Sequence, residues 1–269
     1  MNKYYDKENK RLVVIGESAT EEFWEKHWLD PKDFEKRIKA GASFGIIKKY
    51  TSKFLTPPSK VIDAGCGIGQ NVYGLKQWGY DAYGIDFTDE VVKKTKQIFP
   101  DLKIFAQDVR KLDFPDNFFD GYWSLGVIEH FKDGYGDIIK EARRVIKNDG
   151  YFFLTVPWFS PLRRLKAWLG MYPKIDKNTD MGHFYEFMLD STQLIKTVEN
   201  EGFRLVSRHS NDAVKGLKDE ISCLRPILQK VYDGRGFFSR ALRGLLTVIF
   251  APFAGHIILL IFKKYENKL

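Results

Sequence analysis

Between residues 60 and 157, short apolar runs alternate with amphipathic stretches of about ten residues. The apolar runs have the length and composition of buried strands, and the amphipathic stretches gather their charges on one side, as helices that cover a sheet do. Strands are predicted at 60–63, 81–87, 101–107, 117–125 and 150–156, and helices at 71–78, 88–99 and 136–148. This alternation predicts an α/β fold with helices on both faces of a parallel sheet.

The segment before this pattern, residues 1–50, is predicted to be helical. Residues 17–29 form the first predicted helix, in which Ser18 is the expected N-cap and Glu21 completes a capping box. Residues 31–50 continue with a helical pattern.

Beyond Pro157 the pattern becomes irregular, because prolines, aromatic residues and cations interrupt residues 157–183. A helix at 191–202, ended by Gly202, and a strand at 203–209 then resume the alternation. Apolar residues follow at spacings of three and four, which predicts one amphipathic helix. Its apolar positions are Val214, Leu217, Ile221, Leu224, Leu228 and Val231.

The last feature of the pattern is an apolar stretch of 18 residues, 245–262, without Asp, Glu, Lys or Arg. Its length is at the lower limit for a membrane span. Because a proline and a glycine interrupt its middle, we expect a helix that ends near Phe250 or Ala251 and a strand that starts near His256.

Composition narrows the class of protein. An apolar content of 44% and an aromatic content of 15% exclude a disordered chain. The net charge is +1 in residues 1–150 and +7 in residues 151–269, which suits an acidic substrate, nucleic acid or anionic lipid, or simply a solvated surface. Cys66 and Cys223 are too far apart for a zinc cage or a disulfide framework, and the N-terminus is too polar for a signal peptide. We therefore expect a cytoplasmic protein without a bound metal.

Residues 61–70, VIDAGCGIGQ, hold three glycines directly after a predicted strand. Gly65, Gly67 and Gly69 would let the backbone approach a ligand closely. A phosphate loop would continue with Lys and Ser or Thr, and a dinucleotide site would space its glycines as G-x-G-x-x-G. Neither pattern occurs here, and Asp63 in front of the glycines favours a ligand with a cationic amine.

Two further acids follow the next two predicted strands. Asp86 is placed to accept both hydroxyls of a ribose, and Asp108 to accept from an adenine amino group. Together with Asp63, they describe a ligand that has an amine, a ribose and an adenine. S-adenosylmethionine has all three.

The segments around these acids resemble a known family. They are, in chain order, VIDAGCGIGQNVYGLKQWGYDAYGIDFTDEVV, DVRKLDFPDNFFDGYWSLGVIEHF and EARRVIKNDGYFFLTVP, within residues 59–157. They resemble the class I S-adenosylmethionine-dependent methyltransferases, most of all the branch that acts on small molecules and glycolipid-type acceptors. The resemblance implies a Rossmann-like, mostly parallel sheet of seven strands whose last strand, 255–264, is antiparallel.

The resemblance also implies which residues hold the cofactor. The methionine part would lie against Asp63 and the glycine loop, the ribose against Asp86, and the adenine against Asp108 and Val109. The sulfonium would lie beside Leu125 and Gly126. The expected cofactor residues are thus Asp63, Gly65, Gly67, Gly69, Asp86, Phe87, Asp108, Val109 and Leu125.

The implied domain organisation places a helical lid in front of the core, with Trp24 and His27 over the cofactor. The lid is residues 1–50, the methyltransferase core is 51–211 and 252–269 with 157–183 as an acceptor cap, and 212–251 form an extra helical segment.

The sulfonium makes the methyl group electrophilic, so we expect direct SN2 transfer that depends on alignment of the acceptor. A hydroxyl acceptor would also need a base. His130 follows the fourth strand of the core, near the expected place of the methyl group, and His183 lies where relatives often carry a histidine near the acceptor. Both are candidate catalytic residues, with a structural hydrogen bond as the alternative role of each.

The acceptor can be narrowed by two missing motifs. Methylation of a nucleobase amine uses an Asn/Asp-Pro-Pro-aromatic motif where this chain has SLGVIEHF, and cytosine C5 methylation needs a cysteine that usually lies beside a proline. We therefore expect a small-molecule, sugar or lipid-linked acceptor, methylated at oxygen, and no nucleic acid. A protein or RNA methyltransferase and a non-catalytic scaffold protein with the same fold stay open as alternatives.

Residues 157–172 and 238–251 combine apolar side chains with cations such as Arg163 and Arg164. This combination predicts peripheral contact with a membrane surface or with an apolar acceptor, and packing on the domain is the alternative. The sequence leaves the oligomeric state open.

Overall fold

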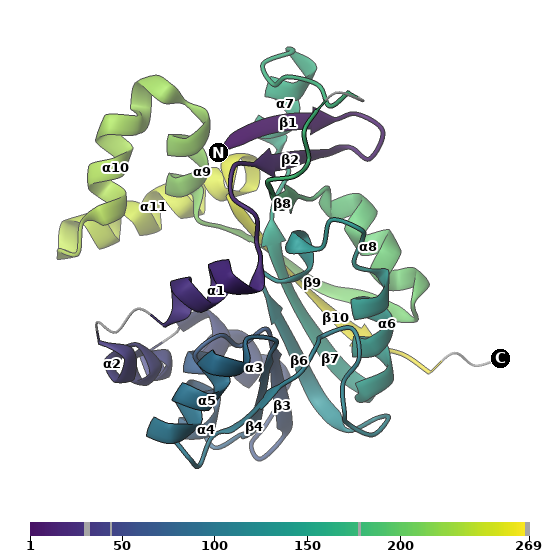
Figure 1. Cartoon of the computed structure of the whole chain (residues 1–269). Coiled ribbons are helices and arrows are strands. Elements are labelled where there is room, and N and C mark those ends of the chain that lie inside the picture. The colour runs from purple at the N-terminus through teal and green to yellow at the C-terminus, as the bar shows by residue number, and fades with distance from the viewer. Residues whose placement is uncertain (30–32, 44, 177–178, 267–269) are drawn as a thin grey trace. The chain divides into compact units, whose positions relative to one another are not determined.

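The computed structural model describes residues 1–29, 33–43, 45–176 and 179–266 (Figure 1). The chain divides into two compact units. Unit 1 contains Met1–Ser18, Thr155–Lys196 and Ser207–Leu260. Unit 2 contains Ala19–Leu154, Thr197–Val206 and the end of the chain from Ile261.

The main element of the fold is a sheet of seven strands in the order β5-β4-β3-β6-β7-β10-β9. The strands are β3 Lys60–Ala64, β4 Asp81–Asp86, β5 Lys103–Ala106, β6 Phe119–Leu125, β7 Ile146–Pro157, β9 Phe203–Asn211 and β10 Ile257–Lys264. β3 pairs in parallel with β4 and with β6, so that Val61 lies opposite Ala82 and Gly121. The predicted Rossmann-like sheet, with its antiparallel end, is confirmed.

Apolar side chains cover both sides of the central strands. Every residue of β3 after Lys60 is buried, Asp63 included, so neither face of this strand is exposed to solvent. On β6, Trp123 stacks on Phe153 with 4.4 Å between ring centroids and donates its indole N–H to Thr51 Oγ1 at 3.0 Å. The helices around the sheet are α3 Gly45–Phe54, α4 Gln70–Gln77, α5 Asp89–Ile98, α6 Gly136–Val145 and α8 Ser191–Asn200.

Unit 1 contains a three-stranded antiparallel sheet that the sequence pattern did not predict. Its strands, in spatial order, are β1 Asn2–Asp6, β2 Arg11–Ile15 and β8 Phe184–Met188. The segment 1–50 is therefore helical only from Glu21 on. The reason is long-range pairing: Leu12 and Val13 are fully buried, and Leu12 lies opposite Met188, far along the chain.

The predicted capping box of the first helix is wrong. α1 is Glu21–Trp28, and its N-cap is Thr20, whose Oγ1 accepts from the Phe23 N–H at 3.3 Å. Ser18 instead donates its hydroxyl to the carbonyl of Gly182 at 3.0 Å. The predicted helix at 31–50 is divided into α2 Phe34–Lys39, η1 Ala40–Ser43 and α3, and residues 31, 32 and 44 lie outside the described residues.

The predicted single helix from Val214 to Val231 is also interrupted. α9 is Ala213–Glu220, η3 is Ser222–Leu224 and α10 is Arg225–Asp233. α9 ends where Ile221 turns extended, and Pro226 lies in the first turn of α10. Since a proline has no N–H to continue the preceding helix, the segment forms two helices.

The helix before the last strand is longer than predicted. α11 is Phe237–Ala254 and runs through Pro252 before Gly255 ends it. Because Pro252 has no N–H, the carbonyl of Val248 has no donor within the helix. Val248 is 79% exposed, so this carbonyl can bind water instead. The remaining helix of unit 1 is α7 Pro161–Trp168.

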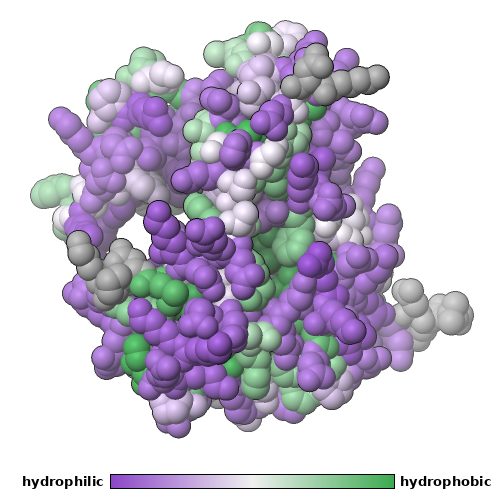
Figure 2. Space-filling view, viewed as in Figure 1, coloured by the Kyte–Doolittle hydropathy of each residue, from purple (hydrophilic) through white to green (hydrophobic). Residues whose placement is uncertain are grey.

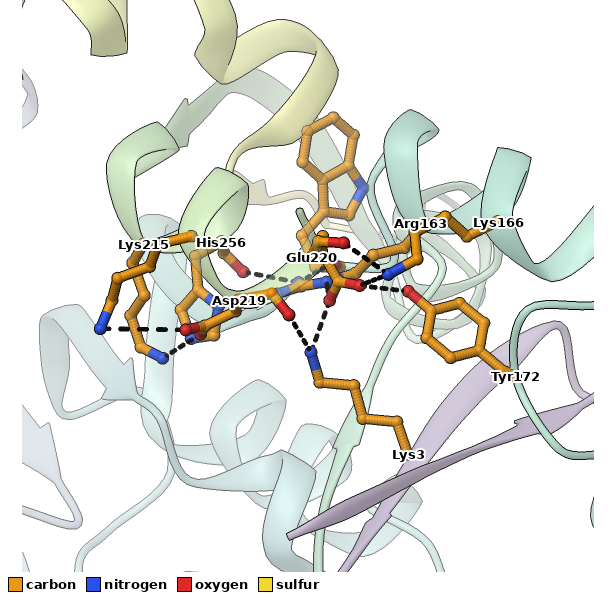
Figure 3. A network of polar contacts seen from close by, with 10 residues as sticks. Lys3, Arg163, Lys166, Tyr172, Lys215, Asp219, Glu220 and His256 are labelled. Carbon is orange, nitrogen blue, oxygen red and sulfur yellow. Dashed lines mark hydrogen bonds and ion pairs between the residues drawn. The ribbon is translucent and has the colours of Figure 1, made fainter. Parts of the chain in front are cut away.

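A buried carboxylate joins α7, α9 and β1 (Figure 3). Glu220 accepts hydrogen bonds from Arg163 Nε at 2.9 Å and from Lys166 Nζ at 2.8 Å, and Lys3 and Tyr172 complete its surroundings. Burial raises the pKa of Glu220, but the charges of Lys3 and Arg163 outweigh this effect and lower the pKa to about 2. Glu220 therefore keeps its negative charge in the core of unit 1, where three cations surround it.

Candidate cofactor site

Unit 2 contains a cavity of about 250 Å³ beside the carboxyl ends of β3, β4, β5 and β6. Its wall includes six of the predicted cofactor residues, namely Gly65, Asp86, Phe87, Asp108, Val109 and Leu125. Parallel α/β sheets bind their ligands at this edge. The other three predicted residues, Asp63, Gly67 and Gly69, are not in the wall.

The glycine loop after β3 has a backbone shape that side chains would prevent. Gly65, Gly67 and Gly69 have φ of +86°, +51° and +77°. A Cβ on Gly65 would lie 2.4 Å from the Val127 side chain, and a Cβ on Gly67 would lie 2.6 Å from the Trp28 ring. Only glycine, which has no Cβ, therefore fits at these positions of the loop.

Asp86, at the end of β4, fixes this loop from the next strand. Its Oδ2 accepts the backbone N–H of Gly67 at 2.7 Å, and its Oδ1 accepts the hydroxyl of Thr88 at 2.6 Å. The side chain is nearly fully buried and lies in the cavity wall. Oδ1 also accepts the backbone N–H of Thr88 at 3.1 Å, whereas Oδ2 keeps a further lone pair. The carboxylate is therefore oriented, and its Oδ2 can still accept a ribose hydroxyl.

Asp63, on β3, has a buried carboxylate whose surroundings favour a positively charged partner. It is completely buried, and Asn71 Nδ2 donates to its Oδ2 at 3.0 Å. Its Oδ1 has no hydrogen-bond partner among the described residues. Burial raises the pKa of Asp63, and although the hydrogen bond from Asn71 lowers it, the neighbouring charge of Asp86 adds to the increase, so that the pKa lies at about 7. Asp63 lies behind the cavity wall, and an ammonium group brought next to its Oδ1 would satisfy this oxygen, so the chemistry of Asp63 fits the amino acid part of a ligand.

Asp108 lies in the cavity wall, but its carboxylate is already bound. Arg110 donates to both of its oxygens, from Nε at 3.0 Å and from Nη2 at 2.5 Å. This contact lowers the pKa of Asp108. Arg110 also lies in the wall, with its guanidinium 5.5 Å from the ring centroid of Phe131. Sequence reasoning missed Arg110, because a single cation in a loop carries no signal of its own.

The helix α1 covers part of the cavity. Trp24 and Trp28 both line it, and their rings stack at 6.4 Å between centroids. His27 is not in the wall; it contacts the edge of Trp28 at 4.8 Å, and burial together with Arg37 lowers its pKa. The prediction for Trp24 therefore agrees with the wall of the cavity. Trp28 was missed, although a spacing of four residues places it on the same helix face as Trp24.

The two candidate catalytic histidines lie in different units. His130, in η2 Ile128–His130, is in the cavity wall and meets Trp24 edge-on at 5.1 Å. His183 belongs to unit 1, where it is exposed on the turn before β8 and accepts the Gly16 N–H through its carbonyl at 2.8 Å. Of the two, the cavity wall contains only His130.

Comparisons with known proteins support the interpretation of this cavity as a cofactor site. Residues 62–154 match the family model of the methyltransferase domain. The chain is 35% identical over 100 residues to 2-methyl-6-phytyl-1,4-hydroquinone methyltransferase of Synechocystis sp., which covers 36% of this chain and 31% of that protein. It is 24% identical over 224 residues to cycloartenol-C-24-methyltransferase of Arabidopsis thaliana, with 77% and 60% covered. The chain thus spans from about a third to three fifths of the curated relatives it matches.

A solved structure has a similar fold over nearly the whole chain. It is the 1,6-didemethyltoxoflavin-N1-methyltransferase of Burkholderia thailandensis with bound 1,6-didemethyltoxoflavin and S-adenosylhomocysteine, at a TM-score of 0.56 over 99% of this chain and 100% of that one. The sequence identity is 14%, so this likeness concerns the fold alone. Together with the glycine loop and its acids, the family match means that this chain carries a class I S-adenosylmethionine-dependent methyltransferase domain, with S-adenosylmethionine as its cofactor.

Proposed function

We propose that the protein transfers the methyl group of S-adenosylmethionine to an apolar, lipid-linked small molecule, at an oxygen atom and by direct SN2 displacement. The names of the two curated relatives refer to a phytyl hydroquinone and to a sterol, which are apolar acceptors. The cavity wall supports an acceptor of this kind, since Trp24, Leu125 and Phe131 contribute to it.

The observation that carries this proposal is the buried Oδ1 of Asp63, next to the glycine loop, which receives no hydrogen bond from the described part of the chain. A buried acceptor without a donor is costly, and a ligand that carries an ammonium group removes the cost. A ribose hydroxyl or an adenine amino group could donate to this oxygen too, but only an ammonium group also brings the positive charge that stabilises a buried carboxylate. The arrangement therefore favours a cofactor with an amino acid part over a plain nucleotide.

The cofactor supplies an electrophilic methyl group on its sulfonium when it is bound. The residues of the chain then have to position it: Asp63 takes the ammonium, and Asp86 holds the loop and accepts from the ribose. Alignment of an acceptor with a fixed methyl group contributes about 7–11 kcal/mol in favourable cases. His130, in the cavity wall, would take the proton of an acceptor hydroxyl.

Calorimetry with S-adenosylhomocysteine tests the cofactor part of this proposal. We expect the protein to bind it and Asp86→Asn to bind it about tenfold or more weakly, because a charged acceptor is lost. Asp137→Asn, on the exposed start of α6, is the matched control and should bind like the wild type. If the wild-type protein does not bind millimolar S-adenosylhomocysteine, the proposed enzyme function is wrong and a non-catalytic scaffold protein is favoured.

Methyl transfer from labelled S-adenosylmethionine tests the acceptor part. The reaction would be offered a synthetic prenylated hydroquinone, a sterol and a water-soluble phenol, with the methylated atom identified by mass spectrometry. We expect O-methylation of a prenylated substrate. A product methylated at carbon would overturn the choice of atom, and activity on the soluble phenol alone would overturn the lipid-linked acceptor.

A further inference from the structure

The helix α11 has its apolar side turned to solvent. Its strongly exposed residues recur every three or four positions along one side, the spacing of a single helix face. Phe238 is 85% exposed, Val248 79% and Leu245 57%. The other large apolar residues exposed on this helix are Phe237, Leu242, Ile249, Phe250 and Phe253.

The opposite side of α11 attaches the helix to the rest of unit 1. Leu246 packs against a core cluster that includes Leu217 of α9 and Leu228 of α10. Arg243 donates from Nη1 to the carbonyl of Tyr232 at 2.7 Å. Because this side is held along its length, and β10 follows directly, α11 is not free to leave the unit and cross a bilayer alone.

Close backbone contact holds the end of α11 as well. Ala251 and Ala254 are buried, and a Cβ on Gly216 of α9 would lie 1.8 Å from the Ala254 carbonyl oxygen. Among the described residues, α11 is the one helix that is long and apolar enough to cross a membrane, at 18 residues with 11% of them buried. A helix fixed on one side and apolar on the other has the form of an element that lies in a membrane interface.

Positive charge surrounds this apolar face. Residues 222–255 contain five Lys and Arg residues and one Asp, a net charge of +4, and residues 234–254 contain no acid. Arg235 and Arg240 are exposed at the start of α11, and Arg225 and Lys230 are exposed on α10. Hydrophilic residues cover most of the surface seen in Figure 2.

We propose that α11 lies in the headgroup region of an anionic bilayer, with Phe238, Leu245 and Val248 inserted and with Arg235 and Arg240 on the lipid phosphates. Apolar insertion and attraction to anionic lipid act together in such helices. A second copy of the chain suits this face less well, since pairing the faces would bring the same cations together. The end of α7 offers a further apolar patch in unit 1, where Trp168 is 80% exposed. This proposal is independent of the acceptor.

Co-sedimentation of the full chain with vesicles tests the proposal. The probes are phosphatidylcholine vesicles and vesicles rich in phosphatidylglycerol, each at low and at high salt. We expect binding to the anionic vesicles that weakens at high salt. Leu245→Glu with Val248→Glu should reduce the bound fraction about tenfold or more, because both inserted side chains become charged. Arg235→Gln with Arg240→Gln should reduce it as well.

The matched control is Ile98→Glu, an exposed apolar position on α5 of unit 2, which should bind vesicles like the wild type. Circular dichroism and the affinity for S-adenosylhomocysteine verify that each variant is folded. Equal vesicle binding by wild type and by the Leu245→Glu, Val248→Glu variant would overturn the proposal. A dimer in solution that this variant dissolves, without vesicle binding, would assign the face to a second copy. Membrane association of the wild type that survives carbonate washing would indicate a span instead.

Discussion

A single hydrogen bond joins Gly67 to Asp86: the backbone N–H of the glycine donates to Oδ2 of the carboxylate at 2.7 Å. Gly67 lies in the loop after β3, and Asp86 ends β4, so the bond connects two neighbouring strands at the edge where the cavity lies. Thr88 holds the other oxygen of the carboxylate. The shape of the glycine loop and the direction of the carboxylate are therefore set together.

Gly67→Ala should disturb this arrangement. The new Cβ would lie 2.6 Å from the Trp28 ring, and the residue would keep a left-handed φ of +51°. We expect a loss of about 1–3 kcal/mol in unfolding free energy from the strained backbone. The displaced Trp28 should also weaken binding of S-adenosylhomocysteine by about tenfold. Thermal unfolding and calorimetry measure the two effects.

Gly136→Ala is the matched control for this change. Gly136 begins α6, and a Cβ there would meet no atom within 4 Å. We expect a change in unfolding free energy within about 0.5 kcal/mol and an unchanged affinity. A Gly67→Ala protein with wild-type affinity and unchanged tryptophan fluorescence would contradict the close contact between the loop and Trp28.

The central sheet could be predicted because its signals are local. Each buried strand between Lys60 and Pro157 is a short apolar run, and each helix between them has its own amphipathic period. The hairpin of β1 and β2 could not be predicted in this way. Residues 12–15, LVVI, are an apolar run, but a run of four residues does not show with which strand it pairs, and Arg11–Ile15 pairs with the distant Phe184–Met188.

Some features of the candidate site could likewise be predicted from the sequence, and others could not. The glycine loop and Asp86 could be found from the sequence, since positive φ and a strand end both restrict the residue type. The position of Asp108 at the ligand site could be predicted. Its hydrogen bonds with Arg110 could not be predicted, because the direction of an exposed side chain depends on its neighbours in space. The burial that raises the pKa of Asp63 is likewise a property of the fold.

Binding of S-adenosylhomocysteine should strengthen as the pH rises toward neutrality. Burial raises the pKa of Asp63 to about 7, so without ligand the carboxyl is largely protonated below that pH. The ammonium of the ligand binds the ionised form better, and the affinity should rise by up to about tenfold per pH unit below pH 7 and level off above it. Calorimetry between about pH 5.5 and pH 8.5 measures this.

In the ligand-free protein, the carboxyl of Asp63 should make the folded state less stable as the pH rises. A carboxyl whose folded pKa is raised favours the folded state at low pH, and this contribution is lost as the pH rises from about 4 to about 7. Asp63→Asn should remove both trends, with weaker but pH-independent binding. A variant that keeps the pH dependence of the wild type would assign the trend to another group.

His130→Ala should reduce turnover more than His183→Ala does. His130 lies in the cavity wall, whereas His183 lies on an exposed turn of unit 1. Removal of a general base costs about a hundredfold or more in kcat, with little change in the affinity for S-adenosylhomocysteine. His130→Gln keeps a polar side chain beside Trp24 and serves as the control for packing. A larger loss of kcat in His183→Ala would make His183 the base.

Glu220→Gln should destabilise unit 1 strongly. The carboxylate is almost fully buried with Arg163, and its loss would leave that guanidinium with Lys3 and Lys166 around a neutral amide. Removing one partner of a buried ion pair costs about 3–5 kcal/mol. Chemical denaturation at neutral pH measures the loss. Glu35→Gln, which affects only the exposed pair with Lys39, is the control and should change the free energy by at most about 1 kcal/mol.

The effect of Glu220→Gln should also depend on pH. The surrounding cations overcome burial and lower the pKa of Glu220 from its ordinary 4.5 to about 2. The wild-type protein therefore has the full contribution of this group above about pH 4.5 and loses it as the pH falls toward 2. The difference in unfolding free energy between wild type and variant should be constant from neutral pH down to about pH 5 and shrink below it. A difference that stays constant down to pH 3 would mean that the cluster stabilises unit 1 by packing, without the charge of Glu220.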